Sequence, residues 1–296
     1  MFRVIAENIN VMSKKIGAAM KARDAKPIQE LAEKLKANGA DYLDINLGPA
    51  RKGGEELMEW VVKTVHEVVD LPLYLDTSNV KAIEAGLKVH KDSAGKPVIN
   101  SISARPERME ALLPLAKEYN AGFVALVLGT EGIPRDESER AANAAMLMAQ
   151  ADEFGIPHED IWIDPIVVPV SSQQQQVASV TVFMQMLPDM SPGYASTCGL
   201  SNVSNGSPDN LRALINQTYL LMLKKASLTG AILDGLDTEI IGLARGERTD
   251  LEEIVAQVMD GSMPDLSSLD EEKRNFAKTT EVLLNQKLYS DSWLEL

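Results

Sequence analysis

Residues 42–46 read Tyr-Leu-Asp-Ile-Asn, a short apolar run that ends in a polar residue and is followed by a helix-length segment. The same arrangement recurs along the chain. Together with 42–46, runs of this kind occupy residues 4–8, 73–76, 98–101, 123–128, 161–164, 197–202 and 231–234. Short apolar runs separated by helical periodicity are typical of parallel strands with helical crossovers. The sequence therefore predicts eight strands.

The segments between these runs carry helix signals. Between the first two runs, Pro27 lies just inside a helix start, apolar residues follow at helical spacing, and Gly39 supplies a stop. Further helices are expected at about residues 57–68, 79–90, 106–119, 137–154, 174–186 and 209–225. Eight strand–helix units fill the ~250 residues of a (β/α)8 TIM barrel. A dinucleotide-binding fold is disfavoured because residues 7–12, after the first run, contain no glycine.

The region after the eighth run is irregular. A helix begins near Thr238, Gly246 and the acidic residues 247–272 interrupt it, and a final helix is expected at 276–288. We interpret residues 245–274 as a helical insertion near the C-terminus of a single domain, residues 1–296. The inserted segment is either a contact for a partner or a solvated surface elaboration.

Composition excludes several classes of function. The 296 residues include 29 Lys and Arg against 43 Asp and Glu, a formal charge of -14, which disfavours nucleic acid and anionic membranes as partners. One cysteine, Cys198, and three histidines argue against thiolate or imidazole metal sites, and no metal is expected. Without a long apolar run or a leader-like N-terminus, the chain is expected to be soluble and cytoplasmic.

The candidate functional residues lie at the ends of the predicted strands, where (β/α)8 barrels carry their active sites. Carboxylates and amides dominate there and basic groups are absent, which disfavours a phosphate ligand. Asp76, Asn100 and Asp164 have the donors and acceptors to bind a flat heterocycle with an amino-amide edge, such as a pterin. Two alternatives remain open: helix capping, above all for Asp44 and Asp234, and a Mg²⁺ or Ca²⁺ site.

Several motifs in one order resemble the pterin-binding methyltransferases, in particular the methyltetrahydrofolate:corrinoid protein methyltransferases of acetogenic and related anaerobic bacteria. The motifs are LDINLGP at 43–49, LDTSN at 75–79, INS at 99–101, IDP at 163–165 and GLSNVS at 199–204. The resemblance implies a barrel, usually a homodimer, that moves a methyl group between N5 of tetrahydrofolate and cobalt. Tetrahydrofolate or 5-methyltetrahydrofolate is then the substrate, and the corrinoid (cobalamin) is carried by a separate partner protein.

The resemblance also assigns roles to residues. Those matching Asp76, Asn100 and Asp164 hold the pterin ring, and Asn202, which matches a residue that hydrogen-bonds near N5, is the catalytic candidate. Three more residues in matching motifs are expected to line the pocket: Asn46, Gly199 and Ser201.

Two departures from the family pattern concern the partner. Residues 245–274 have no counterpart in the shorter acetogen enzymes, and residues 129–134 lack an expected asparagine. These differences favour another corrinoid partner, as in the second methyltransferase of an O-demethylase or methylamine system, with methyl flowing toward tetrahydrofolate. The alternatives are a dihydropteroate synthase-like pterin enzyme, for which Arg51 and Lys52 supply some charge but a later basic motif is missing, and a non-catalytic folate-binding barrel.

Overall fold

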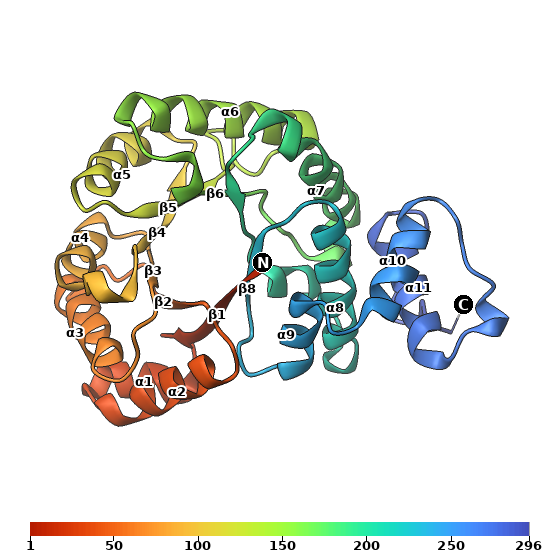
Figure 1. Ribbon diagram of the computed structural model, residues 1–296, viewed down its shortest axis with the longest axis horizontal. Helices are drawn as coiled ribbons and strands as arrows, with labels where there is room; N and C mark the ends of the chain where they lie inside the picture. Colours follow the sequence, from red (N-terminus) through yellow and green to blue (C-terminus); the bar gives the residue numbers. More distant parts are fainter. Residues whose placement is uncertain (296) are drawn as a thin grey trace.

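The computed structural model describes residues 1–295. Its strands form one parallel sheet in the order β7-β6-β5-β4-β3-β2-β1-β8. The strands are β1 (Arg3–Asn10), β2 (Tyr42–Gly48), β3 (Leu73–Thr77), β4 (Val98–Ser103), β5 (Gly122–Leu126), β6 (Ile161–Asp164), β7 (Ala195–Ser196) and β8 (Gly230–Leu233). A parallel bridge between Gly199 and Ile232 joins the two edge strands. The (β/α)8 barrel expected from the sequence is confirmed (Figure 1).

Helices surround the strands as an outer ring, and the last two helices of the chain lie outside this ring (Figure 1). They are α1 (Lys14–Ala22), α2 (Ala25–Ala37), α3 (Gly54–His66), α4 (Val80–Val89), α5 (Pro106–Glu118), α6 (Glu137–Phe154), α7 (Val170–Met190), α8 (Asp209–Lys225), α9 (Thr238–Arg245), α10 (Thr249–Met259) and α11 (Glu271–Leu283). Helix α1 was not predicted. Ser13 caps it by accepting from the Ile16 N–H, and Gly17 allows the close approach of the Val11 carbonyl. No helix within residues 1–295 has the length and apolarity needed to cross a membrane.

The seventh strand differs from its predicted position at residues 197–202. The strand covers only Ala195–Ser196, an isolated bridge follows at Gly199, and Leu200–Ser204 forms a 3-10 helix, η3. Leu200 and Val203 are buried three residues apart, which is the period of a 3-10 turn rather than of a strand. In the sequence, a short run of this kind is compatible with either a strand or a 3-10 turn. The fifth strand also ends earlier than predicted, at Leu126, where Leu128 N–H turns back to the Leu126 carbonyl.

The lower part of the barrel interior is filled by one apolar layer. Three aromatic rings lie within 5.4–6.1 Å of one another in edge-to-face contact, namely Tyr42, Tyr74 and Trp162. Ile5, Tyr74, Val98, Val124, Trp162 and Ile232 form the buried cluster of this layer. Since side chains alternate along a strand, the residue two positions later points inward as well. The layer therefore forms the floor beneath the residues that follow each strand's apolar run.

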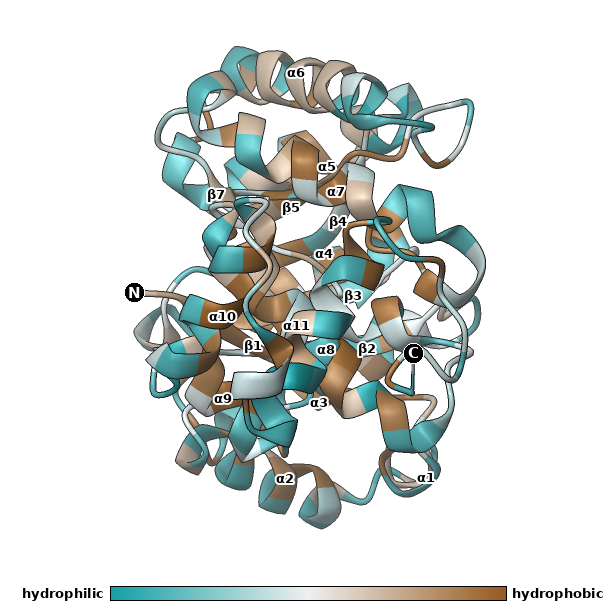
Figure 2. Cartoon of the chain, turned by 90° about the vertical axis from the view of Figure 1, so that its right-hand side faces the viewer, coloured by the Kyte–Doolittle hydropathy of each residue, from teal (hydrophilic) through white to brown (hydrophobic). Residues whose placement is uncertain are grey.

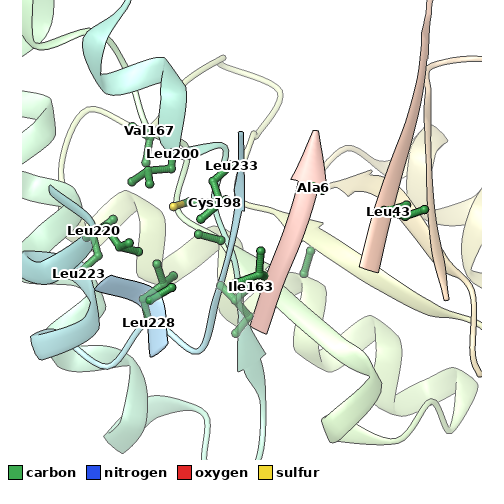
Figure 3. Packing of buried hydrophobic residues seen from close by; sticks show 14 of the residues in the cluster. Ala6, Leu43, Ile163, Val167, Cys198, Leu200, Leu220, Leu223, Leu228 and Leu233 are labelled. Atoms are coloured by element: carbon green, nitrogen blue, oxygen red, sulfur yellow. The ribbon is translucent and has the colours of Figure 1, made fainter. Parts of the chain in front are cut away.

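Along each strand, the residues that alternate with the inward-pointing ones face the helices. Figure 3 shows Ala6, Ile163, Cys198 and Leu233 in the apolar layer between the strands and the helical ring. Cys198 is fully buried there, and burial raises the pKa of its thiol well above the ordinary value. A thiol held protonated in an apolar layer serves as a small core residue.

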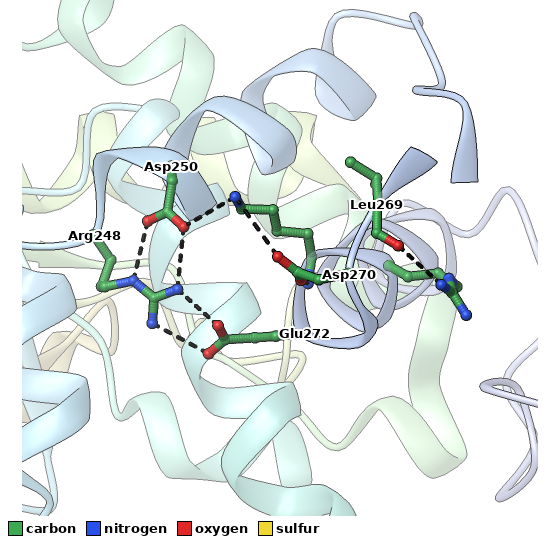
Figure 4. Close-up of polar contacts among 7 residues, drawn as sticks. Arg248, Asp250, Leu269, Asp270 and Glu272 are labelled. Atoms are coloured by element: carbon green, nitrogen blue, oxygen red, sulfur yellow. Dashed lines mark hydrogen bonds and ion pairs between the residues drawn. The ribbon is translucent and has the colours of Figure 1, made fainter. Parts of the chain in front are cut away.

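Residues 245–274, the expected insertion, contain α10 and the start of α11. The two helices together form a helical addition outside α8 (Figures 1 and 2). Helix α11 begins at Glu271 rather than near residue 276, because Asp270 caps it by accepting from the Lys273 N–H. Arg248 joins the starts of α10 and α11 through Asp250 and Glu272, at 2.7–3.2 Å (Figure 4). These exposed ion pairs contribute little energy.

The stability of this addition comes mainly from its apolar faces. The buried residues are Leu251, Val255, Val258, Phe276, Val282 and Leu283. Gln174 fastens the end of the addition to α7, since its amide donates to the Val282 and Lys287 carbonyls and accepts from Tyr289 N–H.

Candidate active site

The mouth of the barrel carries a layer of carboxyl and amide groups directly above the apolar floor. The strands place each of them two residues after a floor residue: Glu7 after Ile5, Asp44 after Tyr42, Asp76 after Tyr74, Asn100 after Val98 and Asp164 after Trp162. Strand register aligns Asp76 with Asn100 and also with Asn46, whereas Asp44 pairs with the floor residue Tyr74. The alternation of the strands thus turns these polar groups into the mouth of the barrel.

Two amide–carboxyl pairs connect β2, β3 and β4. The Asn46 amide donates to the Asp76 carboxylate, and its oxygen accepts from Gly48 N–H at 3.0 Å. The Asn100 amide donates to Asp44 at 3.1 Å. The structure therefore brings together three residues expected from the sequence, Asn46, Asp76 and Asn100, and adds Asp44. That residue, for which capping was an alternative, is only 2% exposed and caps no helix.

Asp164 lies at the end of β6 and is 7% exposed. Its Oδ1 accepts from Ile166 N–H at 2.8 Å. The turn that follows is held from behind by Arg140 of α6, which is fully buried and donates to the Pro165 carbonyl at 2.9 Å. The remaining guanidinium hydrogen bonds of Arg140 go to neutral groups of Ser179 and Gln176. A rigid support of this kind fixes the direction of the carboxyl group.

The remaining expected residues lie at the start of η3, which follows β7 at the place where β7 and β8 close the barrel. The Ser201 hydroxyl donates to Glu7 Oε1 at 2.6 Å. Asn202 is exposed, and its side-chain oxygen accepts from Asn205 at 3.3 Å. Gly199 lies beneath the Asn202 amide, so this turn presents a hydroxyl and an amide side by side at the mouth.

Burial raises the pKa of every carboxyl group in this layer. Desolvation brings the pKa of Asp76 and of Asp164 to about 7. The pKa of Asp44 is raised well above its ordinary value, first by desolvation and then by the nearby Asp76, and that of Glu7 is also raised by burial. Ionised carboxylates in such a place require N–H donors or cationic partners. Within residues 1–295, no group of three or more Asp, Glu, His or Cys side chains is arranged to hold a metal ion.

Reading the strand ends missed the basic groups that reach the mouth from helices. Arg108 at the start of α5 donates to the Ser78 and Ser101 carbonyls, both at 2.9 Å, and so connects the turns after β3 and β4. Arg212 of α8 donates to the Ser204 hydroxyl at 3.3 Å. Both arginines lie on helices, and arginines on helices are mostly exposed to solvent. The sequence alone therefore did not indicate that these two reach the mouth.

The model of the family described as pterin binding enzyme matches residues 6–241, a range that contains all the mouth residues described above. The chain belongs to the pterin binding enzymes. This confirms, at the level of the family, the resemblance that the five motifs indicated. Helices α10 and α11 lie outside the matched range, as additions to this pterin binding barrel.

Curated relatives include a methylcorrinoid:tetrahydrofolate methyltransferase of Eubacterium limosum, 26% identical over 242 residues, which covers 81% of this chain and 87% of that protein. Methionine synthases of Mycobacterium leprae and Mycobacterium tuberculosis are also 26% identical over 242 residues, 78% of this chain, and this chain spans 20% of their length.

Two dihydropteroate synthases are similar in fold among solved structures. The enzyme from Xanthomonas albilineans, in complex with indole-2-carboxylic acid and 6-chloroguanine, gives a TM-score of 0.62 at 18% identity, covering 84% of this chain and 92% of that one. The enzyme from Yersinia pestis, with a pterine-sulfa conjugate, gives 0.61 at 15% identity, covering 83% and 94%. Both solved structures show that this chain and the dihydropteroate synthases share the barrel fold.

Gly199 is expected to be essential for the placement of Asn202 in this pterin binding enzyme. A Cβ at position 199 would lie 2.9 Å from the Asn202 amide nitrogen, so Gly199→Ala must displace that side chain. The backbone at Gly199, with φ of -74°, is open to alanine, which leaves the steric contact as the main effect. For the methyl transfer proposed below, we expect the rate to fall about tenfold or more, while pterin affinity stays within about twofold. Stopped-flow kinetics measure the rate of the Gly199→Ala variant, and a pterin titration measures its affinity. An unchanged rate contradicts the prediction.

Proposed function

We propose that this chain is a methyltransferase that moves a methyl group between N5 of tetrahydrofolate and the cobalt of a corrinoid protein. The observation that carries the proposal is the set of Asp164, which is buried, and Asp76 and Asn100, which are half-buried, at the ends of β6, β3 and β4. A pterin presents an amino group, a ring N–H and a carbonyl along one edge. Carboxylates accept the N–H donors of this edge, and an amide can donate to its carbonyl.

The relatives support the methyl-transfer reaction. A methylcorrinoid:tetrahydrofolate methyltransferase matches over 87% of its own length, so its activity corresponds to a barrel of this extent. The name methylcorrinoid:tetrahydrofolate methyltransferase describes a methyl group that starts on the corrinoid. We therefore propose the same direction here, from the methylcorrinoid protein to tetrahydrofolate.

Asn202 is proposed to act at N5. Breaking the bond between N5 and the methyl group leaves electron density on a poor leaving group, and a hydrogen bond that strengthens in the transition state lowers this barrier. In the opposite direction the same amide orients the N5 lone pair toward the methyl group. The exposed position of Asn202 above Gly199 places its amide at the open side of the mouth, where a corrinoid would approach.

Dihydropteroate synthesis is the competing reaction on this fold. The solved dihydropteroate synthases support it only through their fold. The mouth layer is rich in carboxyl groups, whereas that reaction needs cationic groups for a pyrophosphate ester. Arg108, which connects the turns after β3 and β4, uses two of its donors on backbone carbonyls.

The deciding experiment is an assay of methyl transfer with free cobalamin in both directions. Purified protein is mixed with methylcob(III)alamin and tetrahydrofolate, or with cob(I)alamin and 5-methyltetrahydrofolate, and the corrin absorbance is followed. Transfer supports the proposal. Dihydropteroate formation from a pterin pyrophosphate and p-aminobenzoate, without methyl transfer, rejects it. Folate binding without either reaction favours a binding barrel.

The partner is proposed to be the corrinoid protein of an O-demethylase or methylamine system, with the enzyme a cytoplasmic homodimer. The addition of α10 and α11 outside the family range is the feature that motivates a different partner. We expect a lower KM for a demethylase or methylamine corrinoid protein than for one of the carbon monoxide pathway. A strong preference for the latter overturns this assignment, and sedimentation analysis tests the dimer.

A further inference from the structure

The contact between β1 and η3 pairs two side chains that are 194 residues apart in the chain. The Ser201 hydroxyl donates to Glu7 Oε1 at 2.6 Å, a short hydrogen bond between a hydroxyl group and a carboxylate. Ser201 directly precedes Asn202, the residue proposed to act at N5. In the ring of strands, β7 and β8 lie across the barrel from β3 and β4. A pterin held by its amino-amide edge at β3 and β4 therefore turns its other ring toward Ser201.

Charged groups from several elements surround Glu7. Burial has the largest effect on the pKa of Glu7 and raises it, and the hydrogen bond from Ser201 lowers it. Asp234, after β8, raises it as well, and Arg212 of α8 lowers it. Two further titratable groups, Asp44 on β2 and Cys198 after β7, are near enough to respond to the charge of Glu7. Glu7 is consequently able to exchange a proton closer to neutral pH than an exposed glutamate.

Glu7 also lines a pocket in which Ser201 takes no part. A pocket of about 710 Å³ lies between β1, α1, α2 and the turn after β8, and Glu7 forms part of its wall. Asn8 donates to Asp234 at 2.6 Å along the same wall. The rim includes Met12 and Glu30. Protons can enter or leave Glu7 from this pocket while Ser201 faces the mouth.

We propose that Ser201 and Glu7 form the proton relay that serves N5, an inference that rests on the proposed methyl transfer. Toward tetrahydrofolate, the N5 lone pair bonds to the methyl carbon, and the carbon–cobalt bond breaks with its electron pair left on cobalt. The proton that N5 carried passes to Ser201 Oγ, whose own proton moves to the Glu7 carboxylate and leaves through the pocket. In the opposite direction Glu7 supplies the proton, and every step reverses.

The test compares Glu7→Gln with wild-type protein. Glutamine retains an oxygen that accepts from Ser201 but cannot carry the proton. We expect transfer in both directions to slow by about 100-fold, the size typical of lost acid–base catalysis. In wild-type protein, transfer toward tetrahydrofolate should accelerate as pH rises through the pKa of Glu7, and the opposite reaction should slow. Both slopes should vanish in Glu7→Gln, with tetrahydrofolate affinity within about threefold, since the binding layer at β3, β4 and β6 is untouched.

The matched control is Glu30→Gln, an exchange of the same type at an exposed position on the rim of the same pocket. It should leave rate and pH profile unchanged. Ser201→Ala is the second variant, and it should slow transfer without the loss of folate binding. If wild-type protein transfers methyl groups and Glu7→Gln keeps its rate and pH profile, the relay is wrong. If wild-type protein transfers none, the proposed function itself is wrong and the relay with it.

Discussion

Asn202→Ala is expected to slow methyl transfer by about 100-fold, the cost typical of removing one hydrogen bond made mainly in the transition state. Its affinity for tetrahydrofolate should change by less than about threefold, because the side chain is exposed on η3 and lies apart from the amide–carboxyl pairs of β2, β3 and β4. Single-turnover rates with methylcob(III)alamin, measured at saturating tetrahydrofolate, separate the two effects.

The control for Asn202→Ala is Asn210→Ala, an exchange of the same type at an exposed position in the first turn of α8. It should leave both rate and affinity unchanged. An Asn202→Ala variant with full turnover removes this residue from the chemistry at N5. A variant that instead loses folate affinity and rate together assigns Asn202 to binding alone.

The candidate site residues that could be predicted from the sequence are those whose position in the barrel follows from the strand period alone. Asp76, Asn100 and Asp164 each follow an inward apolar residue by two positions, so the strand period alone brings them to one layer. The barrel itself was predictable for the same reason, because strand and helix periods alternate eight times.

What the sequence did not reveal depends on distant pairs. The contact of Ser201 with Glu7 exists only once the barrel closes, and the support of the Asp164 turn by Arg140 crosses from helix to strand. Arg140 had the pattern of an ordinary helix residue, yet it is fully buried. The short β7 was misplaced because residues from Leu200 onward form η3, which packs against α8 instead of continuing the strand. Tertiary contacts of this kind leave no periodic signal.

Asp164→Asn is expected to weaken tetrahydrofolate binding and to stabilise the fold at the same time. Asparagine retains the oxygen that accepts from Ile166 N–H, so the turn keeps its support. It loses the negative charge and one acceptor for the N–H groups of a pterin. A hydrogen bond to a charged group is worth about 1.5–3 kcal/mol, which corresponds to a loss of affinity of about 10- to 150-fold. Fluorescence titration with tetrahydrofolate measures it.

The gain in stability follows from the pKa of Asp164, raised by burial from 3.8 to about 7. Between these values the folded protein binds more protons than the unfolded chain, so the free energy of unfolding falls as pH rises through this range. Above pH 7 the buried carboxylate costs on the order of 4 kcal/mol, a cost that Asp164→Asn removes and that vanishes below about pH 4. Urea denaturation at pH 8 and pH 5 should show a much larger advantage for the variant at pH 8.

The exposed Asp209→Asn, in the first turn of α8, controls for the loss of one negative charge and should show no such pH-dependent advantage. Equal stability of Asp164→Asn and wild-type protein at pH 8 contradicts the buried ionised state. Together the two readouts distinguish a binding group from a structural one, because a carboxylate retained only for the fold would lower stability when replaced. A residue that costs stability and increases ligand affinity is kept for its ligand.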